Sequence, residues 1–167
     1  MAAIDPDDVS LHIVLVEPLI PPNTGTIGRL ALAAGAALHL VEPLGFDIDD
    51  KAVRRAGLDY WKHVDLRVHR NWDACLKALD AQPERVFLLS THAQRPYTSV
   101  RFARGDVVVF GKETSGLGPE FLEGAAEQAL GVPFFGAVRS LNLSTTVGIV
   151  VYEALRQIRP ADFPGPA

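Results

Sequence analysis

The sequence predicts an α/β fold in which a parallel sheet is flanked by helices. Short apolar segments rich in β-branched residues recur along the chain, and each is followed by a turn and a helical pattern. These segments are too short and too continuously apolar for strands with one face in water. They are typical of parallel strands that are covered on both faces.

The elements follow one another in a regular order. The expected strands are 11–16 (LHIVLV), 37–42 (ALHLVE), 85–90 (RVFLLS), 106–111 (DVVVFG) and 130–135 (LGVPFF). The expected helices occupy about 24–35, 71–81, 119–126 and 142–158, with a shorter one near 49–56. With 167 residues, of which 48% are hydrophobic, we expect a single domain over 10–159, followed by a flexible tail over 160–167.

Composition narrows the classes of protein that fit. The single cysteine, Cys75, excludes an intrachain disulfide, and its helical spacing with Trp72, Leu76 and Leu79 favours a buried hydrophobe over a reactive thiol. The first ten residues are acidic and no apolar run reaches the roughly 18 residues that a membrane span needs. We therefore expect a cytoplasmic protein that does not associate with the membrane.

Charge is distributed unevenly along the chain. A net charge of -4 argues against coating nucleic acid through bulk electrostatics. Between residues 51 and 70, however, six basic residues stand against two acidic ones. Lys51, Arg54 and Arg55 fall at i, i+3 and i+4, and we expect this helical face to contact phosphates of a nucleic acid. A merely solvated face is the alternative.

Three polar loops follow predicted strands. They read THAQRP (91–96), GKETSGLG (111–118) and GAVRSLNLS (136–144). In open parallel sheets, ligands gather beyond the carboxyl ends of the strands. Loops so rich in glycine, hydroxyl, amide and charge are unusual as mere connectors, so we expect them to form one site.

The segment PPNTGTIGR (21–29) follows the first strand. Asn23 is either a simple N-cap of the next helix or, together with Arg29, faces a ligand. Gly25 and Gly28 would let that ligand approach the backbone. The dinucleotide-binding pattern G-x-G-x-x-G is absent, which disfavours a nicotinamide-dependent enzyme.

The segment FGKETSGLG (110–118) is not a phosphate-binding loop, because the Walker spacing is missing and Glu113 would repel phosphate. Its glycines indicate a tightly folded loop, either a structural turn or one in which Glu113 accepts hydrogen bonds. The segment RSLNLSTTVGIVVYEAL (139–155) begins with polar residues and continues as an apolar helix. Asn142 or Ser144 can cap that helix, but capping alone leaves Arg139 without a role.

These three segments, in this order, resemble the three motifs of the SPOUT class of RNA 2'-O-methyltransferases. IVLVEPLIPPNTGTIGRL, LHLVEPLGF and RRAGLDYW look like the YibK-like members, which act on nucleotide 34 of tRNA. The resemblance covers residues 11–159. It implies a C-terminal deep trefoil knot, an exception to the rule against knots. It also implies S-adenosyl-L-methionine as the cofactor, the anticodon loop of tRNA as the substrate, and no metal.

The resemblance also assigns residues to roles. The positions that match cofactor contacts are Leu89, Gly111, Val132 and Ser140, with Leu141 and Asn142 beside them. Arg29 matches the central catalytic arginine. Because a guanidinium holds its proton at physiological pH, we interpret Arg29 as a clamp on the substrate phosphate and hydroxyl, with Asn23, Glu113 and Ser140 holding the geometry. Lys112 departs from the proline that is usual in the family.

The C-terminal helix suggests self-association. Between Val147 and Leu155 nearly every residue is aliphatic or alanine, and these residues point around the whole helix. We therefore expect a homodimer with Tyr152 at the interface. Two alternatives to the main function remain: a 2'-O-methyltransferase for another tRNA or rRNA position, and a non-catalytic RNA-binding domain.

Overall fold

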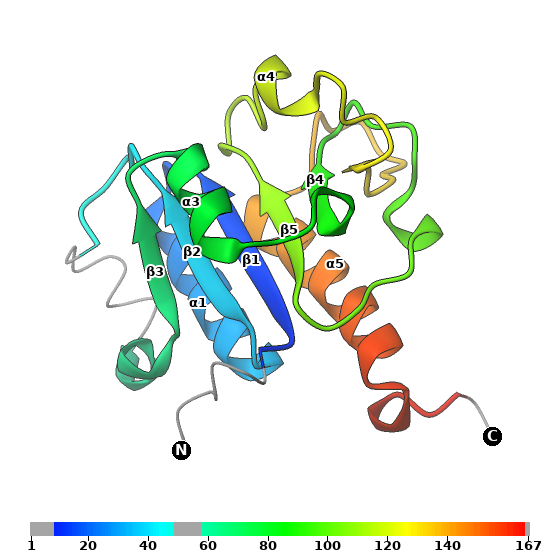
Figure 1. Ribbon diagram of the computed structural model, residues 1–167, viewed down its shortest axis with the longest axis horizontal. Coiled ribbons are helices and arrows are strands. Elements are labelled where there is room, and N and C mark those ends of the chain that lie inside the picture. Colours follow the sequence, from blue (N-terminus) through cyan, green and yellow to red (C-terminus); the bar gives the residue numbers. More distant parts are fainter. Residues whose placement is uncertain (1–8, 49–57, 166–167) are drawn as a thin grey trace.

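The computed structural model describes residues 9–48 and 58–165, and a six-stranded sheet forms its centre (Figure 1). The strand order is β3-β2-β1-β5-β4-β6, and every pair is parallel. The strands are β1 (Leu11–Val16), β2 (Ala37–Val41), β3 (Leu66–His69), β4 (Val86–Leu89), β5 (Asp106–Phe110) and β6 (Ala129–Leu130). The predicted parallel sheet is confirmed.

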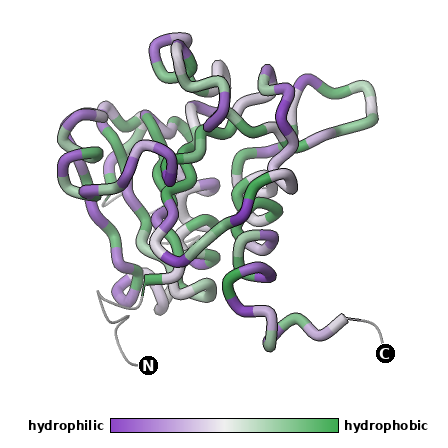
Figure 2. The backbone as a smooth tube through the Cα atoms, turned by 45° about the vertical axis from the view of Figure 1, so that its right-hand side comes forward, coloured by the Kyte–Doolittle hydropathy of each residue, from purple (hydrophilic) through white to green (hydrophobic). Residues whose placement is uncertain are grey.

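Helices cover both faces of this sheet, as predicted. They are α1 (Pro21–Ala34), α3 (Trp72–Leu79), α4 (Pro119–Leu122) and α5 (Leu143–Ile158). Helices α1 and α5 contact each other on one face and share a core with it, whereas α3 lies on the other face (Figure 1). Figure 2 shows hydrophobic residues running through the centre of the molecule, where the strands lie.

Short 3-10 turns connect these elements. They are η2 (Leu58–His63), η3 (Pro83–Arg85), η4 (Tyr97–Ser99) and η5 (Pro160–Asp162). The last of these lies in the predicted tail, where the ring of Phe163 packs edge-on against Tyr152 with 6.3 Å between the ring centres. No helix among residues 9–48 and 58–165 is long and apolar enough to span a membrane.

The start of α1 differs from the prediction. The helix begins at Pro21, and Ile20 is its N-cap, so the prediction of Asn23 as the cap is wrong. Proline is well suited to the first turn, because its φ is already helical and its missing N–H would have no helical partner there. Gly35 ends the helix in the left-handed region, with φ of 63°.

Two strands were predicted poorly. The segment 130–135 forms a strand only over Ala129–Leu130, because the chain then leaves the sheet at Gly131 and continues as the loop to α5. Strand β3 was missed. It is a four-residue edge strand with Arg67 and His69 in it, so it lacks the continuous apolar run of the inner strands. The predicted helix near 49–56 lies outside the described residues.

Candidate active site

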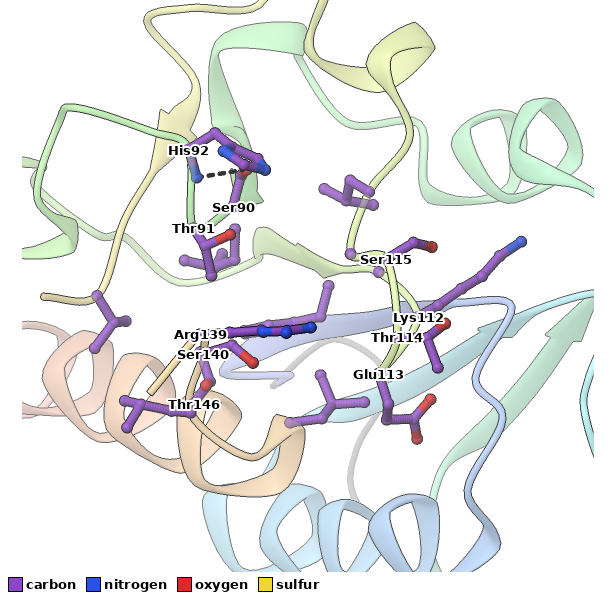
Figure 3. A pocket seen from close by; sticks show the side chains of 18 of the residues that line it. Ser90, Thr91, His92, Lys112, Glu113, Thr114, Ser115, Arg139, Ser140 and Thr146 are labelled. Carbon is purple, nitrogen blue, oxygen red and sulfur yellow. Dashed lines mark hydrogen bonds between the residues drawn. The ribbon is translucent and has the colours of Figure 1, made fainter. Parts of the chain in front are cut away.

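A cavity of about 320 Å³ lies at the carboxyl ends of β4, β5 and β6 (Figure 3). All three predicted loops contribute to it, as does the start of α5. Five of the six predicted cofactor residues line this cavity: Leu89, Gly111, Val132, Ser140 and Leu141. The structure therefore brings together residues that are up to 52 positions apart in the chain.

The cavity has an apolar floor and a polar rim. The floor comes from strand ends and the loop beyond β6, including Phe110 and Leu130. Around it lie hydroxyl groups of the labelled residues Thr91, Ser140 and Thr146, together with the guanidinium of Arg139 (Figure 3). Such a cavity suits a ligand with a flat apolar part and polar groups at its ends. Arg139, which capping could not explain, thus lies at the cavity wall.

The loop after β5 is folded tightly on itself. Lys112 and Gly116 exchange two backbone hydrogen bonds, of 3.2 and 2.9 Å. A Cβ atom on Gly111 would lie 2.1 Å from the carbonyl carbon of Gly116, and Gly116 itself has φ of +68°. Both glycines are therefore required by the turn that forms one wall of the cavity.

Glu113 joins this loop to the start of α1. Its carboxylate accepts hydrogen bonds from the backbone N–H of Leu19 at 2.8 Å and of Ile20 at 3.1 Å. It also accepts one from Nδ2 of Asn23 at 3.1 Å. The carboxylate thus holds the chain just before the helix, where negative charge is favourable. Glu113 is a positioning residue, since its hydrogen bonds go to the protein.

Asn23 and Asn142 extend this connection to α5. Nδ2 of Asn142 donates to Oδ1 of Asn23 at 3.1 Å. Oδ1 of Asn142 accepts from the backbone N–H of Ser144 at 2.9 Å and caps the helix, which confirms the predicted cap. We call Glu113, Asn23 and Asn142 the edge network. Asn142 is not among the residues that line the cavity, but it fixes the helix that does.

Lys112 forms a second connection between the β5 loop and the β1 loop. Its ammonium pairs with the carboxylate of Glu17, and both side chains are about one-third exposed. Glu17 has a positive φ of 50°, which is uncommon for a residue with a side chain. The lysine that departs from the family pattern is thus paired with an acid at the cavity wall.

Arg29 does not line the cavity of its own chain. It is exposed on α1, and its guanidinium lies over the ring of Tyr60, 5.0 Å from the ring centre. Arg29 lies six positions after Asn23 in the helix, which is not a whole number of turns, so the two side chains point in different directions. Gly28 has a packing role here, since a Cβ on it would lie 2.4 Å from the ring of Trp61.

Comparisons with known proteins agree with this geometry. A model described as the SpoU rRNA Methylase family matches residues 10–152. The chain belongs to the SpoU rRNA Methylase family. The family resemblance seen in the three motifs is thereby confirmed.

Individual SpoU relatives cover nearly the whole chain. A tRNA (cytidine(34)-2'-O)-methyltransferase of Burkholderia pseudomallei (strain 1106a) is 50% identical over 147 residues, which are 87% of this chain and 94% of the relative. A solved structure described as structural insights into the 2-OH methylation of C/U34 on tRNA is 46% identical, with a TM-score of 0.81. That match covers 88% of this chain and 95% of the other.

A more distant SpoU structure contains the cofactor. It is an AdoMet-bound rRNA methyltransferase from Sinorhizobium meliloti, 26% identical, with a TM-score of 0.79. The match covers 92% of this chain and 58% of that one. The cavity of the present chain thus belongs to a methyltransferase fold in which a relative binds AdoMet.

Proposed function

We propose that this protein transfers a methyl group from S-adenosyl-L-methionine to the ribose 2'-hydroxyl of the wobble nucleotide, position 34, of tRNA. The observation that carries the proposal is the cavity where the three motif loops meet, in a chain half identical to an enzyme named for this reaction. The nucleotide is a cytidine or a modified uridine.

The residues present fit the cofactor. Leu89, Val132 and Leu141 offer apolar walls to an adenine ring, while Ser140 and the backbone of the glycine loop offer hydrogen-bond groups. The tight closure of that loop at Gly111 keeps its backbone against the cavity. When bound, the cofactor supplies a methyl group already activated by its sulfonium, so methyl transfer needs no metal.

The protein aligns the hydroxyl with that methyl group. A ribose hydroxyl is a poor nucleophile, so alignment and proton removal determine the rate. Arg29 clamps the phosphate and hydroxyl of the nucleotide. Glu113 and Asn23 keep α1, which carries Arg29, in place against the cavity loops.

A homodimer built on α5 supplies the remaining part of the site. Val147, Val150, Val151, Ala154 and Leu155 are buried within one chain, so the monomer already covers much of the apolar helix. Tyr152 stays 48% exposed. An aromatic ring with a polar tip suits an interface. A second copy would also bring an exposed Arg29 toward a cavity that its own chain does not let it line.

Three further features belong to this proposal. Lys51, Arg54 and Arg55, which lie outside the described residues, contact tRNA phosphates. The site of action is the cytoplasm. The C-terminal part threads through a loop to form the trefoil knot. The close approach of Gly131 to the loop after β4 supports the knot. The N–H of Gly131 donates to the backbone carbonyl of Arg95, and its carbonyl accepts from the backbone N–H of Tyr97. A Cβ on Gly131 would lie 2.9 Å from the carbonyl oxygen of Ala93.

The decisive experiment is methylation of tRNA with labelled S-adenosyl-L-methionine, followed by mapping of the modified nucleotide. Label at the 2'-oxygen of nucleotide 34 is expected. Methylation elsewhere would refute the substrate, and cofactor binding without any transfer would indicate the non-catalytic domain.

Arg29→Ala tests the role of the arginine. We expect methyl transfer to fall at least about 100-fold, because a misaligned hydroxyl reacts slowly. Calorimetry should show unchanged cofactor affinity, since the proposed contacts of Arg29 are with the nucleotide and those of the cofactor are with the cavity loops. Arg101→Ala, at an exposed position outside the site, is the matched control. Equal loss of cofactor affinity would contradict the assignment.

The dimer is tested by sedimentation. The wild-type protein should sediment at about twice the chain mass of 18.1 kDa. Tyr152→Ala should weaken the dimer and lower activity together, whereas Arg101→Ala should change neither. A fully active monomer would overturn this part of the proposal.

A further inference from the structure

A row of three histidines crosses the opposite half of the sheet, away from the cavity. Nδ1 of His12 lies 3.1 Å from Nε2 of His39, and Nδ1 of His39 lies 2.9 Å from Nε2 of His69. We call His12, His39 and His69 the histidine ladder. None of the three lines the cavity.

Strand register explains why the ladder forms. His39 is opposite Arg67, and His69 is opposite Val41, so the two histidines are offset by two residues and lie on the same face of the sheet. That face is the one covered by α3. The thiol of Cys75, in α3, points to it, and the ligand atoms of His39, His69 and Cys75 lie within 4.8 Å of one another.

We propose that His39, His69 and Cys75 bind one Zn²⁺ ion. Two imidazole nitrogens and a sulfur are donors that zinc prefers over magnesium or calcium. The three donors come from β2, β3 and α3, and two of the side chains, His39 and Cys75, are fully buried. A preformed cluster of this kind needs little rearrangement to hold an ion.

The ladder can place the lone pair of His39 correctly. If Nε2 of His39 carries the proton and donates it to Nδ1 of His12, Nδ1 of His39 is free to bind the metal. Metal-bound histidines usually donate their other N–H to such an acceptor, which fixes the ring and raises its basicity. His12 is therefore a positioning residue of the site and not a ligand.

Binding requires a small adjustment and the release of one proton. Tetrahedral zinc holds nitrogen and sulfur ligands roughly 3.3 to 3.6 Å apart, so the rings of His39 and His69 move apart slightly and the sulfur moves inward. The S–H bond of Cys75 breaks, its proton goes to solvent, and a Zn–S bond forms. Nε2 of His69, which donates to Nδ1 of His39 in the metal-free protein, loses its proton while Nδ1 of His69 gains one, so His69 stays neutral and Nε2 can bind the ion. Burial raises the pKa of this thiol to about 12, so affinity increases with pH.

The surroundings allow one open coordination position. His69 is only half-buried, so water can reach the ion from its side of the cluster and serve as the fourth ligand. The charge of Arg67 acts on both His39 and His69, and it is balanced by a bidentate pair with Asp65, at 3.0 and 2.8 Å. The ion would fasten the edge strand β3 to β2 and α3.

Cobalt provides the first test, on the unmodified full-length chain. Co²⁺ added to the metal-free protein should give the absorption bands of a tetrahedral site with a thiolate-to-cobalt transition, and one equivalent of Zn²⁺ should remove them. This measurement needs no variant. Absence of the thiolate band, or no Zn²⁺ uptake in competition with a chromogenic chelator, would overturn the proposal.

Variants provide the second test. Cys75→Ala and His69→Ala should each lower Zn²⁺ affinity at least about tenfold, and His12→Asn should lower it by about 10- to 100-fold through the lost acceptor. His63→Asn, outside the ladder, should bind like the wild type. Zn²⁺ should raise the Tm of the wild type but not of Cys75→Ala. Equal affinity in all variants would place the ion elsewhere and refute the site.

Discussion

The edge network and the histidine ladder are two polar networks with opposite characters. Each joins three elements through hydrogen bonds of about 3 Å. The edge network is built on a carboxylate, Glu113, and fastens loops that no sheet pairing holds. The ladder consists only of imidazoles and crosses strands that backbone hydrogen bonds already pair.

This difference predicts that the edge network determines the geometry of the cavity loops, whereas the histidine ladder affects the stability of the fold. Loops around the cavity depend on side-chain hydrogen bonds for their positions, so damage to the edge network should appear in methyl transfer. Strands under the ladder keep their positions without it, so damage there should appear in the free energy of unfolding and its pH dependence. Three predictions test this contrast, from the largest effect to the smallest.

Glu113→Ala should have the largest effect. It leaves the N–H groups of Leu19 and Ile20 and the amide of Asn23 without their acceptor. We expect the free energy of unfolding to fall by about 3 kcal/mol and methyl transfer by at least about 100-fold. Chemical unfolding and the tRNA assay measure the two effects. Glu123→Ala, at an exposed position, is the control. Wild-type activity in Glu113→Ala would contradict the proposed difference between the two networks.

His39 should make stability depend on pH. Burial, followed by the neighbouring His12, His69 and Arg67, lowers the pKa of His39 from 6.5 to about 3. Between pH 3 and pH 6.5, His39 binds a proton in the unfolded chain but not in the folded chain. The contribution of His39 is therefore complete above pH 6.5 and decreases as the pH falls toward 3.

The expected loss between pH 6.5 and pH 5 is on the order of 2 kcal/mol. Urea unfolding in the presence of a chelator at the two pH values measures it. His39→Asn should reduce this pH dependence, and His63→Asn should retain it. If activity at neutral pH fell with His39→Asn as steeply as with Glu113→Ala, the two networks would not be separable.

Asn142→Ser should give the smallest effect and sharpen the role of the edge network. Asn142→Ser keeps an N-cap but cannot reach Asn23, so it loses one hydrogen bond, or about 1 kcal/mol. Asn142→Ala also loses the cap and should cost about 2 kcal/mol in unfolding. Comparing the two variants for activity isolates the Asn23 contact. Full activity in Asn142→Ser would show that only the cap matters.

The fold was predictable where apolar runs are continuous. Strands β1, β2, β4 and β5 are buried on both faces, and their sequences show it directly. Edge strand β3 was not predictable in this way, because half-exposed residues interrupt its pattern. The start of α1 was misplaced because its partner, Glu113, comes from a loop more than 90 positions away.

The candidate site was predictable for a related reason. Parallel strands place their following loops at one edge, so the order of elements alone brought residues such as Leu89 and Ser140 together. The position of Arg29 relative to the cavity was not predictable, since it depends on the packing of α1 against Tyr60. The Zn²⁺ ion proposed for His39, His69 and Cys75 departs from the expectation of no metal. The cluster of His39, His69 and Cys75 depends on strand register, which sequence spacing does not reveal.

The hydrogen bond between Asn23 and Asn142 has a consequence for synthesis on the ribosome. It spans 119 positions, and the cavity wall includes Thr146. A nascent chain that has emerged as far as β6 contains the six strands of the described sheet but lacks Arg139, Ser140 and the cap of α5. The cavity is therefore complete only after Thr146 has been translated, and a chain that stops at β6 lacks part of the site proposed for the methyl donor.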